Sequence, residues 1–336
     1  MNPSMQAERT VAAQPFLDKI LAGELAKQTA AKMLAKARPD LFKTSELARD
    51  YFRRVTGAKG EAVSNRPCVQ EVYHMTIKEG LERMGAPISN APVDTSMTGK
   101  IGVLSDIHVP YHDYAALEVA LQHLAESEVE HILLLGDIVD FQGISRFVRP
   151  MGNPSVAQEL ASLKAFLGLV REMFPGGRIV YLLGNHEERL QAYMYTQMRE
   201  LADLKELEFE NLIEAEKFGV EVVDGMVNLG ELIAIHGHEF KNGIAPPVNP
   251  ARGMFMRAKC STLSGHQHQP SSHSEGTLKG DRIGNWSLGC LCELSPGYNK
   301  FAFTKWDHGF AEVEVSEDGG FSVYNYRIVS GKVRPA

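Results

Sequence analysis

Between residues 101 and 268, five short apolar runs each end in a cluster of Asp, Asn or His side chains. The clearest run, at 132–135, is too short for a stable helix and is followed by Gly136 and Asp137. It reads as a buried strand of a parallel sheet, and such sheets place their ligands at the carboxyl ends of the strands. Burying a carboxylate there is costly unless a cation lies beside it.

The five clusters share carboxylate, imidazole and amide groups as their metal-binding side chains. In chain order they are Ser105-Asp106-Ile107-His108, Gly136-Asp137-Ile138-Val139-Asp140, Gly184-Asn185-His186-Glu187, Ile235-His236-Gly237-His238 and Gly265-His266-Gln267-His268. Each cluster alone is weak evidence, because a single His after a strand is usually structural. As a set they suit divalent ions such as manganese, iron or zinc. The lack of paired thiolates argues against a structural zinc site.

Composition fits an ordinary water-soluble protein. The chain has 336 residues, of which 44% are hydrophobic and 23% charged, so it can hold one large catalytic domain and a small one. No apolar run approaches the roughly 18 residues of a membrane span, and no secretion signal precedes the first helix, so we expect a cytoplasmic protein without membrane contacts. The pair Cys290-Leu-Cys292 could bind metal or react, but its spacing favours buried packing.

The N-terminal part predicts a small helical domain. Helix-forming text runs over 14–37 with an interruption near Gly23, a second helix begins at Thr44 or Ser45, and a third covers 67–84. This pattern favours a helix-turn-helix-like module. A turn-rich linker at 85–99 follows. We therefore expect a helical module with its linker over 1–95 and a catalytic domain over 96–336.

Charge is distributed unevenly along the chain. Residues 1–100 hold 15 Lys and Arg against 11 Asp and Glu, whereas the remainder holds 20 against 31. Between Lys27 and Lys59 there are 9 basic and 3 acidic residues. The two parts are therefore expected to have different partners.

Beyond Lys100, strands and helices alternate before a strand-only tail that begins at Trp286. The expected strands are 101–104, 132–135, 179–183, 220–223, 232–235 and 261–264, and the expected helices are 113–127, 155–174, 187–217 and 250–259. This order predicts an α/β fold of two packed mixed β-sheets flanked by helices, an αββα sandwich, beside the small N-terminal helical domain.

With all five clusters in order over about 100–310, the sequence resembles the calcineurin-like metallophosphoesterase superfamily. The resemblance implies two divalent metal ions, with manganese expected first and iron, zinc or nickel as alternatives. It implies one ion held by Asp106, His108 and His268, a second held by Asn185, His236 and His266, and Asp137 between them. His186 would face the substrate.

The implied reaction is attack on a phosphoester by a hydroxide that bridges the two metals. His186 would stabilise the transition state or protonate the leaving oxygen. Substrate contacts are expected from His112 or Tyr111, and a phosphate contact from Arg252. Asp140 either orients a metal ligand or caps a helix. His238 holds a metal ligand in place, faces the substrate or is a solvated loop histidine.

The segment after the second cluster bears on the substrate. Protein Ser/Thr phosphatases have Arg-Gly there, whereas this chain has Phe141-Gln142-Gly143. The first cluster resembles the nuclease and phosphodiesterase branches, and the overall layout resembles phosphoesterases of phages and prophages.

Three hypotheses about function follow. The first is a phosphodiesterase that acts on DNA or RNA held by the N-terminal module. The second is a phosphomonoesterase for a nucleotide or another small molecule, in which the module makes oligomer contacts. The third is a DNA-binding or assembly protein with a vestigial metal site. The acidic catalytic domain weighs against a polyanionic substrate.

Overall fold

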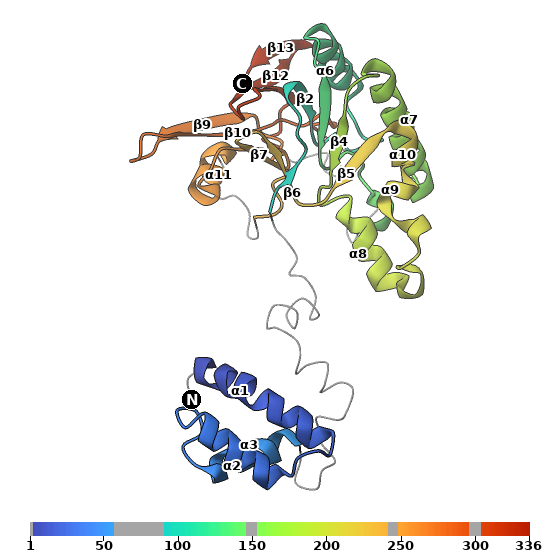
Figure 1. Ribbon diagram of the computed structural model, residues 1–336. Coiled ribbons are helices and arrows are strands. Elements are labelled where there is room, and N and C mark those ends of the chain that lie inside the picture. Colours follow the sequence, from blue (N-terminus) through green and yellow to red (C-terminus); the bar gives the residue numbers. More distant parts are fainter. Residues whose placement is uncertain (1–2, 57–90, 146–152, 241–247, 296–303) are drawn as a thin grey trace. The chain divides into compact units, whose positions relative to one another are not determined.

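A computed structural model of the chain describes residues 3–56, 91–145, 153–240, 248–295 and 304–336. The chain divides into two compact units, Met1–Ser89 and Asn90–Ala336 (Figure 1). The predicted helix over 67–84 lies outside the described residues. The predicted division into 1–95 and 96–336 therefore stays a prediction, because most of the segment joining the two units is not described.

The first unit, called the helical unit below, contains helices α1 (Pro3–Leu21), α2 (Lys27–Ala37) and α3 (Ser45–Thr56). Helix α1 begins well before the predicted residue 14 and includes Pro15. The backbone N–H of Leu47 donates to Thr44 Oγ1 over 3.2 Å, so Thr44 caps α3 as one of the two predicted residues. Apolar side chains from all three helices form a separate core around Phe52.

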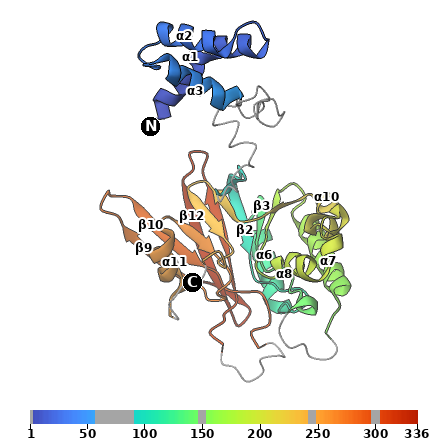
Figure 2. The same cartoon turned by 90° about the horizontal axis from the view of Figure 1, so that it is seen from below.

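The second unit contains two mixed sheets (Figure 2), and it is called the catalytic unit below after the catalytic domain that the sequence predicts there. One sheet has the order β13-β12-β11-β2-β3-β4-β5, with bounds Lys332–Pro335, Phe321–Val329, Gly309–Val315, Gly99–Leu104, His131–Leu135, Ile179–Leu182 and Val220–Val223. The other has the order β1-β6-β7-β8-β10-β9, with bounds Val93–Asp94, Met226–Leu229, Leu232–Ile235, Thr262–Ser264, Arg282–Ser287 and Ser271–Gly276.

Strand β3 shows why the two sheets pack face to face. Its residues are buried on both faces: Ile132 and Leu134 pack under helices, while Leu133 and Leu135 join the core between the sheets. Helices α6 (Tyr114–Glu126) and α7 (Val156–Met173) cover the first sheet, and α11 (Pro250–Ala258) packs on the second. The predicted αββα sandwich is confirmed.

The predicted helix over 187–217 is wrong, because the chain breaks repeatedly there. The segment forms α8 (Glu188–Gln197), two 3-10 turns (Arg199–Leu201 and Lys205–Leu207), α9 (Phe209–Leu212) and α10 (Ala215–Phe218). A straight helix would carry Phe209 and Ile213 far from the sheet. The breaks return them to it: Ile213 is buried, and the Phe209 ring lies 5.4 Å from that of Tyr181.

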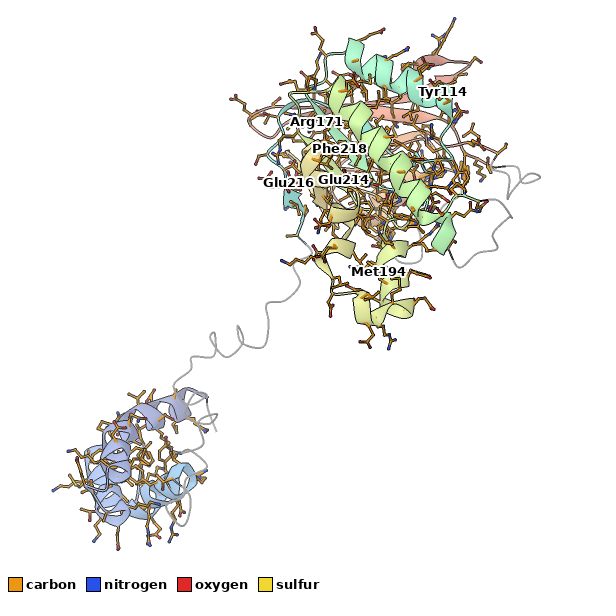
Figure 3. All side chains as sticks on the ribbon, turned by 90° about the vertical axis from the view of Figure 1, so that its right-hand side faces the viewer. Tyr114, Arg171, Met194, Glu214, Glu216 and Phe218 are labelled. Atoms are coloured by element: carbon orange, nitrogen blue, oxygen red, sulfur yellow. The ribbon has the colours of Figure 1, made fainter. Side chains whose placement is uncertain are left out.

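Arg171 on α7 fixes the end of this segment (Figure 3). Its guanidinium donates to the carbonyl oxygens of Phe218 over 2.7 Å and Gly219 over 2.8 Å. These bonds satisfy carbonyl groups at the end of α10.

Among the helices in the described ranges, none has both the length and the apolar character needed to cross a membrane.

Candidate metal centre

The five polar clusters follow the carboxyl ends of strands from both sheets. Strands β2, β3 and β4 are parallel neighbours in one sheet, and β7 and β8 are parallel neighbours in the other. Because the sheets pack face to face, the loops after these strands meet at one edge of the sandwich. The structure thereby brings together all seven residues predicted to bind metal.

Several of these residues have a backbone that favours glycine. The φ angles lie between 52° and 66° at Asp106, His108, Asp137, His266 and His268. Such left-handed conformations cost free energy for residues with a Cβ atom and cluster at functional sites. The loops therefore turn sharply after each strand and direct these side chains toward one another.

Close backbone packing explains two of the glycines in the clusters. A Cβ atom on Gly136 would meet the His236 ring and the backbone of Gly184. A Cβ atom on Gly184 would meet the backbone N and Oδ1 of Asp137. These glycines let the loops after β3 and β4 approach closely enough for their side chains to share one site.

Asp137 occupies the middle of the cluster. Its Oδ2 lies 3.2 Å from His236 Nε2, 3.6 Å from His186 Nε2 and 3.9 Å from His108 Nε2. Its other oxygen, Oδ1, accepts the backbone N–H of His186 over 2.8 Å. A single buried carboxylate thus faces three imidazole nitrogens.

Asp106 forms the second focus. Its Oδ1 lies 3.0 Å from His268 Nε2 and 4.0 Å from His108 Nε2. Its Oδ2 accepts from Ser105 Oγ over 2.6 Å and from the backbone N–H of His266 over 2.8 Å. His108 Nε2 therefore lies between the two carboxylates.

Main-chain and carboxylate oxygens fix which nitrogen of two histidines faces the centre. The Nδ1 atom of His236 lies 2.9 Å from the carbonyl oxygen of Leu135, and Nδ1 of His108 lies 3.0 Å from Asp140 Oδ1. These oxygens accept, so each Nδ1 carries the proton and each Nε2 keeps its lone pair for a metal ion.

Buried atoms without partners support this assignment. Among the described residues, His108 Nε2, Asn185 Oδ1 and His236 Nε2 are buried and make no hydrogen bond. His236 Nε2 is close to Asp137, but the two groups are not aligned for a bond. Unpaired buried polar atoms are costly, and although other described side chains also have them, these three are ligand atoms of the predicted types within one cluster. The residues therefore fit divalent cations.

The electrostatics point the same way. Burial raises the pKa of Asp137, but the nearby His236 and His186 outweigh it and hold that pKa well below its usual range. Burial lowers the pKa of His236, yet Asp137 raises it to about 10, and Asp106 does the same for His268. Bound cations would take the place of these imidazolium protons beside the carboxylates.

His186 is held by two neighbours at the edge of the site. Its Nδ1 lies 2.9 Å from the carbonyl oxygen of Asp140, and its Nε2 lies 2.7 Å from a guanidinium nitrogen of Arg189. Because a guanidinium only donates, Nε2 accepts and Nδ1 carries the proton. Arg189 also donates to the Asp140 carbonyl over 3.0 Å, so the three residues form one unit.

Glu187 is a residue that the sequence analysis did not single out. Its side chain is 3% exposed and accepts the backbone N–H groups of Asp137, Ile138, Val139 and Gly184 over 2.8–3.2 Å. The hydroxyl of Tyr181 also donates to it over 2.7 Å. Glu187 thus holds the loop that carries Asp137. The sequence feature that could have identified it is its position at the end of the Gly-Asn-His-Glu cluster.

The remaining predicted residues lie at different distances from the centre. Tyr111 lines the same cavity of about 210 Å³ as Asp137 and His186, together with Cys292, Glu293 and Trp306, which the sequence analysis did not assign to the site. His238 pairs with Glu188 over 2.8 Å, and its ring lies 5.4 Å from that of His236. Arg252 is an exposed residue of α11 and does not line this cavity.

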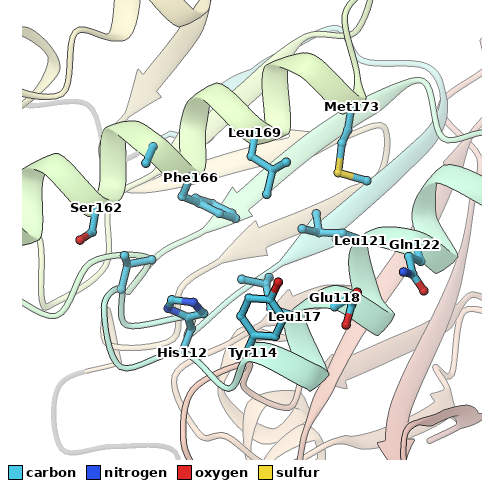
Figure 4. A pocket seen from close by; sticks show the side chains of 12 residues that line it. His112, Tyr114, Leu117, Glu118, Leu121, Gln122, Ser162, Phe166, Leu169 and Met173 are labelled. Carbon is cyan, nitrogen blue, oxygen red and sulfur yellow. The ribbon is translucent and has the colours of Figure 1, made fainter.

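His112 lines a separate cavity of about 520 Å³ between α6 and α7 (Figure 4). The other lining residues are mostly apolar and include Leu117, Phe166 and Leu169. The neighbouring Tyr111 lines the smaller cavity. The two residues predicted to contact substrate therefore line different cavities.

Comparison with known proteins gives a family match. The sequence model of the calcineurin-like phosphoesterase family matches residues 99–281. A comparison with curated proteins found no match.

Similar solved structures include Vps29 from Cryptosporidium parvum, with 14% identity over 71% of this chain and 95% of that one and a TM-score of 0.39. The phosphoesterase YfcE from E. coli has 16% identity over 67% and 97%, with a TM-score of 0.32. A dimetal phosphatase from Danio rerio has 12% identity over 68% and 96%, with a TM-score of 0.32.

Proposed function

The chain belongs to the calcineurin-like phosphoesterase family, and from this premise we propose that the catalytic unit hydrolyses phosphoesters with two divalent metal ions. The observation that carries the proposal is the set of buried, unpartnered ligand atoms on His108, Asn185 and His236 around the central carboxylate of Asp137. No hydrogen bonding within the described protein accounts for that arrangement, whereas metal coordination does.

The proposed ligands divide into two sets that share Asp137. One ion would be held by Asp106, His108 and His268, and the other by Asn185, His236 and His266. Manganese is the first expectation, with iron, zinc or nickel as alternatives, because the ligands are carboxylate, amide and imidazole groups. A shared carboxylate offsets the repulsion between two cations held close together.

When bound, such an ion pair supplies a water molecule of lowered pKa and neutralises the charge of the phosphate. The chain itself orients the reaction through His186. Its Nδ1 proton is donated to the Asp140 carbonyl, which leaves Nε2 directed toward Asp137 and the guanidinium of Arg189. With a second proton on Nε2, in place of the contact with Arg189, His186 would stabilise negative charge on the phosphate or transfer that proton to the leaving oxygen.

Metal analysis of the purified full-length protein tests the proposal. We expect about two divalent ions per chain after reconstitution, and hydrolysis that depends on the added ion. The Asp137→Asn variant should lose both ions and activity, while the exposed Asp281→Asn should match wild type. One ion per chain, or activity in the presence of a strong chelator, would contradict the dinuclear mechanism.

We further propose that the substrate is a phosphodiester in nucleic acid, held in part by the helical unit. The support is electrostatic: this unit carries exposed basic residues on two helices, including Lys32 and Lys36 on α2 and Arg53 and Arg54 on α3. Lys and Arg that neutralise phosphates give sequence-independent binding that weakens with salt.

A binding titration over several salt concentrations tests this substrate. Reversing Lys32 and Lys36 to Glu should weaken DNA or RNA binding and flatten its dependence on salt. Reversing the exposed Lys279 of the catalytic unit to Glu is the control and should change neither. Binding that is independent of salt would exclude the electrostatic contact.

A small phosphomonoester is the second candidate, and two observations favour it. The cavity beside the proposed centre is only about 210 Å³, and residues 101–336 carry an excess of acidic groups that would repel a polyanion. Rates on bis-nitrophenyl phosphate, mono-nitrophenyl phosphate and oligonucleotides separate the two candidates. Faster hydrolysis of the monoester, with none of the oligonucleotide, would select the small substrate.

A further inference from the structure

His268 differs from His108 and His236, the two other proposed ligands for which a partner of Nδ1 has been described. Its Nε2 lies 3.0 Å from Asp106 Oδ1, on the side of the proposed centre. Its Nδ1 lies 3.9 Å from the thiol sulfur of Cys292, where His108 and His236 have an oxygen. The indole of Trp306 packs against the ring, with centroids 4.4 Å apart.

The protonation state of the His268 ring determines whether the Cys292 sulfur can accept a hydrogen bond from it. If Nε2 of His268 binds a metal ion, its Nδ1 must carry the proton and needs an acceptor. Cys292 is 4% exposed, and its sulfur is the atom that the structure places there. Sulfur is a weaker acceptor than a carboxylate or carbonyl oxygen, and at 3.9 Å it is within the range of a hydrogen bond to this Nδ1.

The position of the sulfur is set by the main chain on both sides. The N–H of Leu291 donates to the Asp106 carbonyl over 3.0 Å, and the N–H of Glu293 donates to the Tyr111 carbonyl over 2.9 Å. His308 Nε2 also lies 3.0 Å from the carbonyl oxygen of Cys292. Cys292 is therefore tied to the same loop that carries Asp106 and His108.

The other buried thiol of this segment has a different environment. Cys290 is fully buried, and its sulfur lies 3.7 Å from the carbonyl oxygen of Asp307, with no contact to a proposed metal ligand. The two cysteines stand two residues apart and are comparably buried. The Cys290 thiol also hydrogen-bonds that of Cys292, so the independent control is Cys260, whose sulfur lies 3.6 Å from Thr262 Oγ1.

We propose that Cys292 is a positioning residue of the metal centre, whose thiol accepts from His268 Nδ1 and holds Nε2 toward the ion shared with Asp106 and His108. The sulfur and one ring nitrogen each of His108 and His268 lie within 4.8 Å of one another, and His108 Nε2 is buried without a partner. The inference rests on the proposed dinuclear centre and adds a residue to it.

Metal titrations of full-length wild type, Cys292→Ala, Cys292→Ser and the control Cys260→Ala test the role. We expect Cys292→Ala to weaken binding of Mn²⁺ or Co²⁺ at one of the two sites by about 10- to 100-fold, with the second site less affected. Cys292→Ser, which keeps a hydrogen-bonding atom, should recover part of the affinity. Cys260→Ala, which leaves the surroundings of Cys292 unchanged, should bind both ions as wild type does.

Two further readouts separate the explanations. The melting temperature of each metal-free variant shows whether it folds, and the increase on adding Mn²⁺ reports binding independently of activity. The absorption spectrum of the Co²⁺-loaded protein reports sulfur ligation. A sulfur-to-cobalt charge-transfer band that Cys292→Ala abolishes would make Cys292 a ligand and overturn the positioning role.

The failure of this inference is distinct from that of the proposed function. If Cys292→Ala folds and binds both ions as tightly as wild type, the positioning role is excluded while the metal centre stands. If wild type binds no divalent ion, the proposed centre itself fails. Should Cys292→Ala not fold, the near-isosteric Cys292→Ser decides the question by the same titration.

Discussion

His186 contacts both the central carboxylate and a fixed guanidinium without being one of the proposed ligands. Replacing it should therefore affect turnover more than metal content. We expect His186→Gln to retain both ions and to lower kcat by about 10²- to 10⁴-fold, because the group that assists proton transfer is lost. Metal analysis beside steady-state kinetics checks this, and loss of an ion in the variant would assign His186 to coordination.

Glu159 on α7 makes stability depend on pH. Its side chain is fully buried, accepts the backbone N–H of Gln142 over 3.0 Å, and has a pKa raised from 4.5 to about 7, chiefly by burial. The folded protein therefore holds this proton at pH values where the unfolded chain has lost it. Stability should fall as the pH rises from about 4.5 to 7, by roughly 2 to 3 kcal/mol from this group.

Glu159→Gln tests that dependence because the amide keeps an acceptor oxygen but cannot ionise. Denaturant unfolding at several pH values should show a flatter profile for the variant than for wild type. The exposed Glu172→Gln on the same helix is the control and should leave the profile unchanged. Parallel profiles for wild type and Glu159→Gln would contradict the assignment.

At the residue scale, sequence reasoning was strongest where a residue type implies its own chemistry. The Asp, Asn and His clusters predict metal ligands, and the structure brings these residues together, while their role in binding metal stays a prediction. The residues that hold those ligands, such as Glu187 and Cys292, could not be assigned, because their partners are backbone groups and rings on other loops. A carboxylate that accepts backbone N–H groups looks like any other Glu in the sequence.

At the scale of elements, α7 is the helix whose start the sequence marks most clearly. Ser155 accepts the N–H of Gln158, and the Gln158 side chain accepts the N–H of Ser155, which makes a capping box. Ser155→Ala should cost about 1 kcal/mol in the free energy of unfolding. Ser162→Ala within the same helix is the control and should stay within about 0.5 kcal/mol in a denaturant titration; equal effects would contradict the capping role.

Apolar runs in the sequence identified the central strands, whereas some other elements have no apolar run. Strands β5 and β7 have the predicted bounds, and both are rich in Val, Ile or Leu. Strand β9 was missed because its sequence, Ser-Ser-His-Ser-Glu-Gly, is polar and mostly exposed. The breaks in 187–217 were missed as well, because burial of Phe209 and Ile213 against other elements causes them.

At the scale of the whole molecule, each unit has its own apolar core. The core of the helical unit is made of residues 12–55, and the cores of the catalytic unit are made of residues beyond 96. We expect two thermal unfolding transitions. Only the melting temperature of the catalytic unit should rise when Mn²⁺ is added. In calorimetry, the Phe52→Ala variant should show a lower melting temperature for the helical unit alone. A shift of both melting temperatures would contradict independent folding.

The order of helices and strands along the chain predicted the sandwich, but strand order needed the structure. Strand β11 pairs with β2, with Ala311 beside Val103. Partners so far apart in sequence are selected by the packing of both faces of the sheet, which no local pattern records. The uneven charge of the two parts can be counted from the sequence alone. The sequence does not identify the binding partner of either part.

The proposed ligands come from loops of both sheets, three from one and three from the other, apart from the shared Asp137 and its own strand β3. Coordinated ions would therefore cross-link the two halves of the sandwich. Chelation should then accelerate amide hydrogen exchange at the ends of β2, β4, β7 and β8 together, rather than in one loop. The ions that support hydrolysis would then also stabilise the packing of the two sheets that supply their ligands.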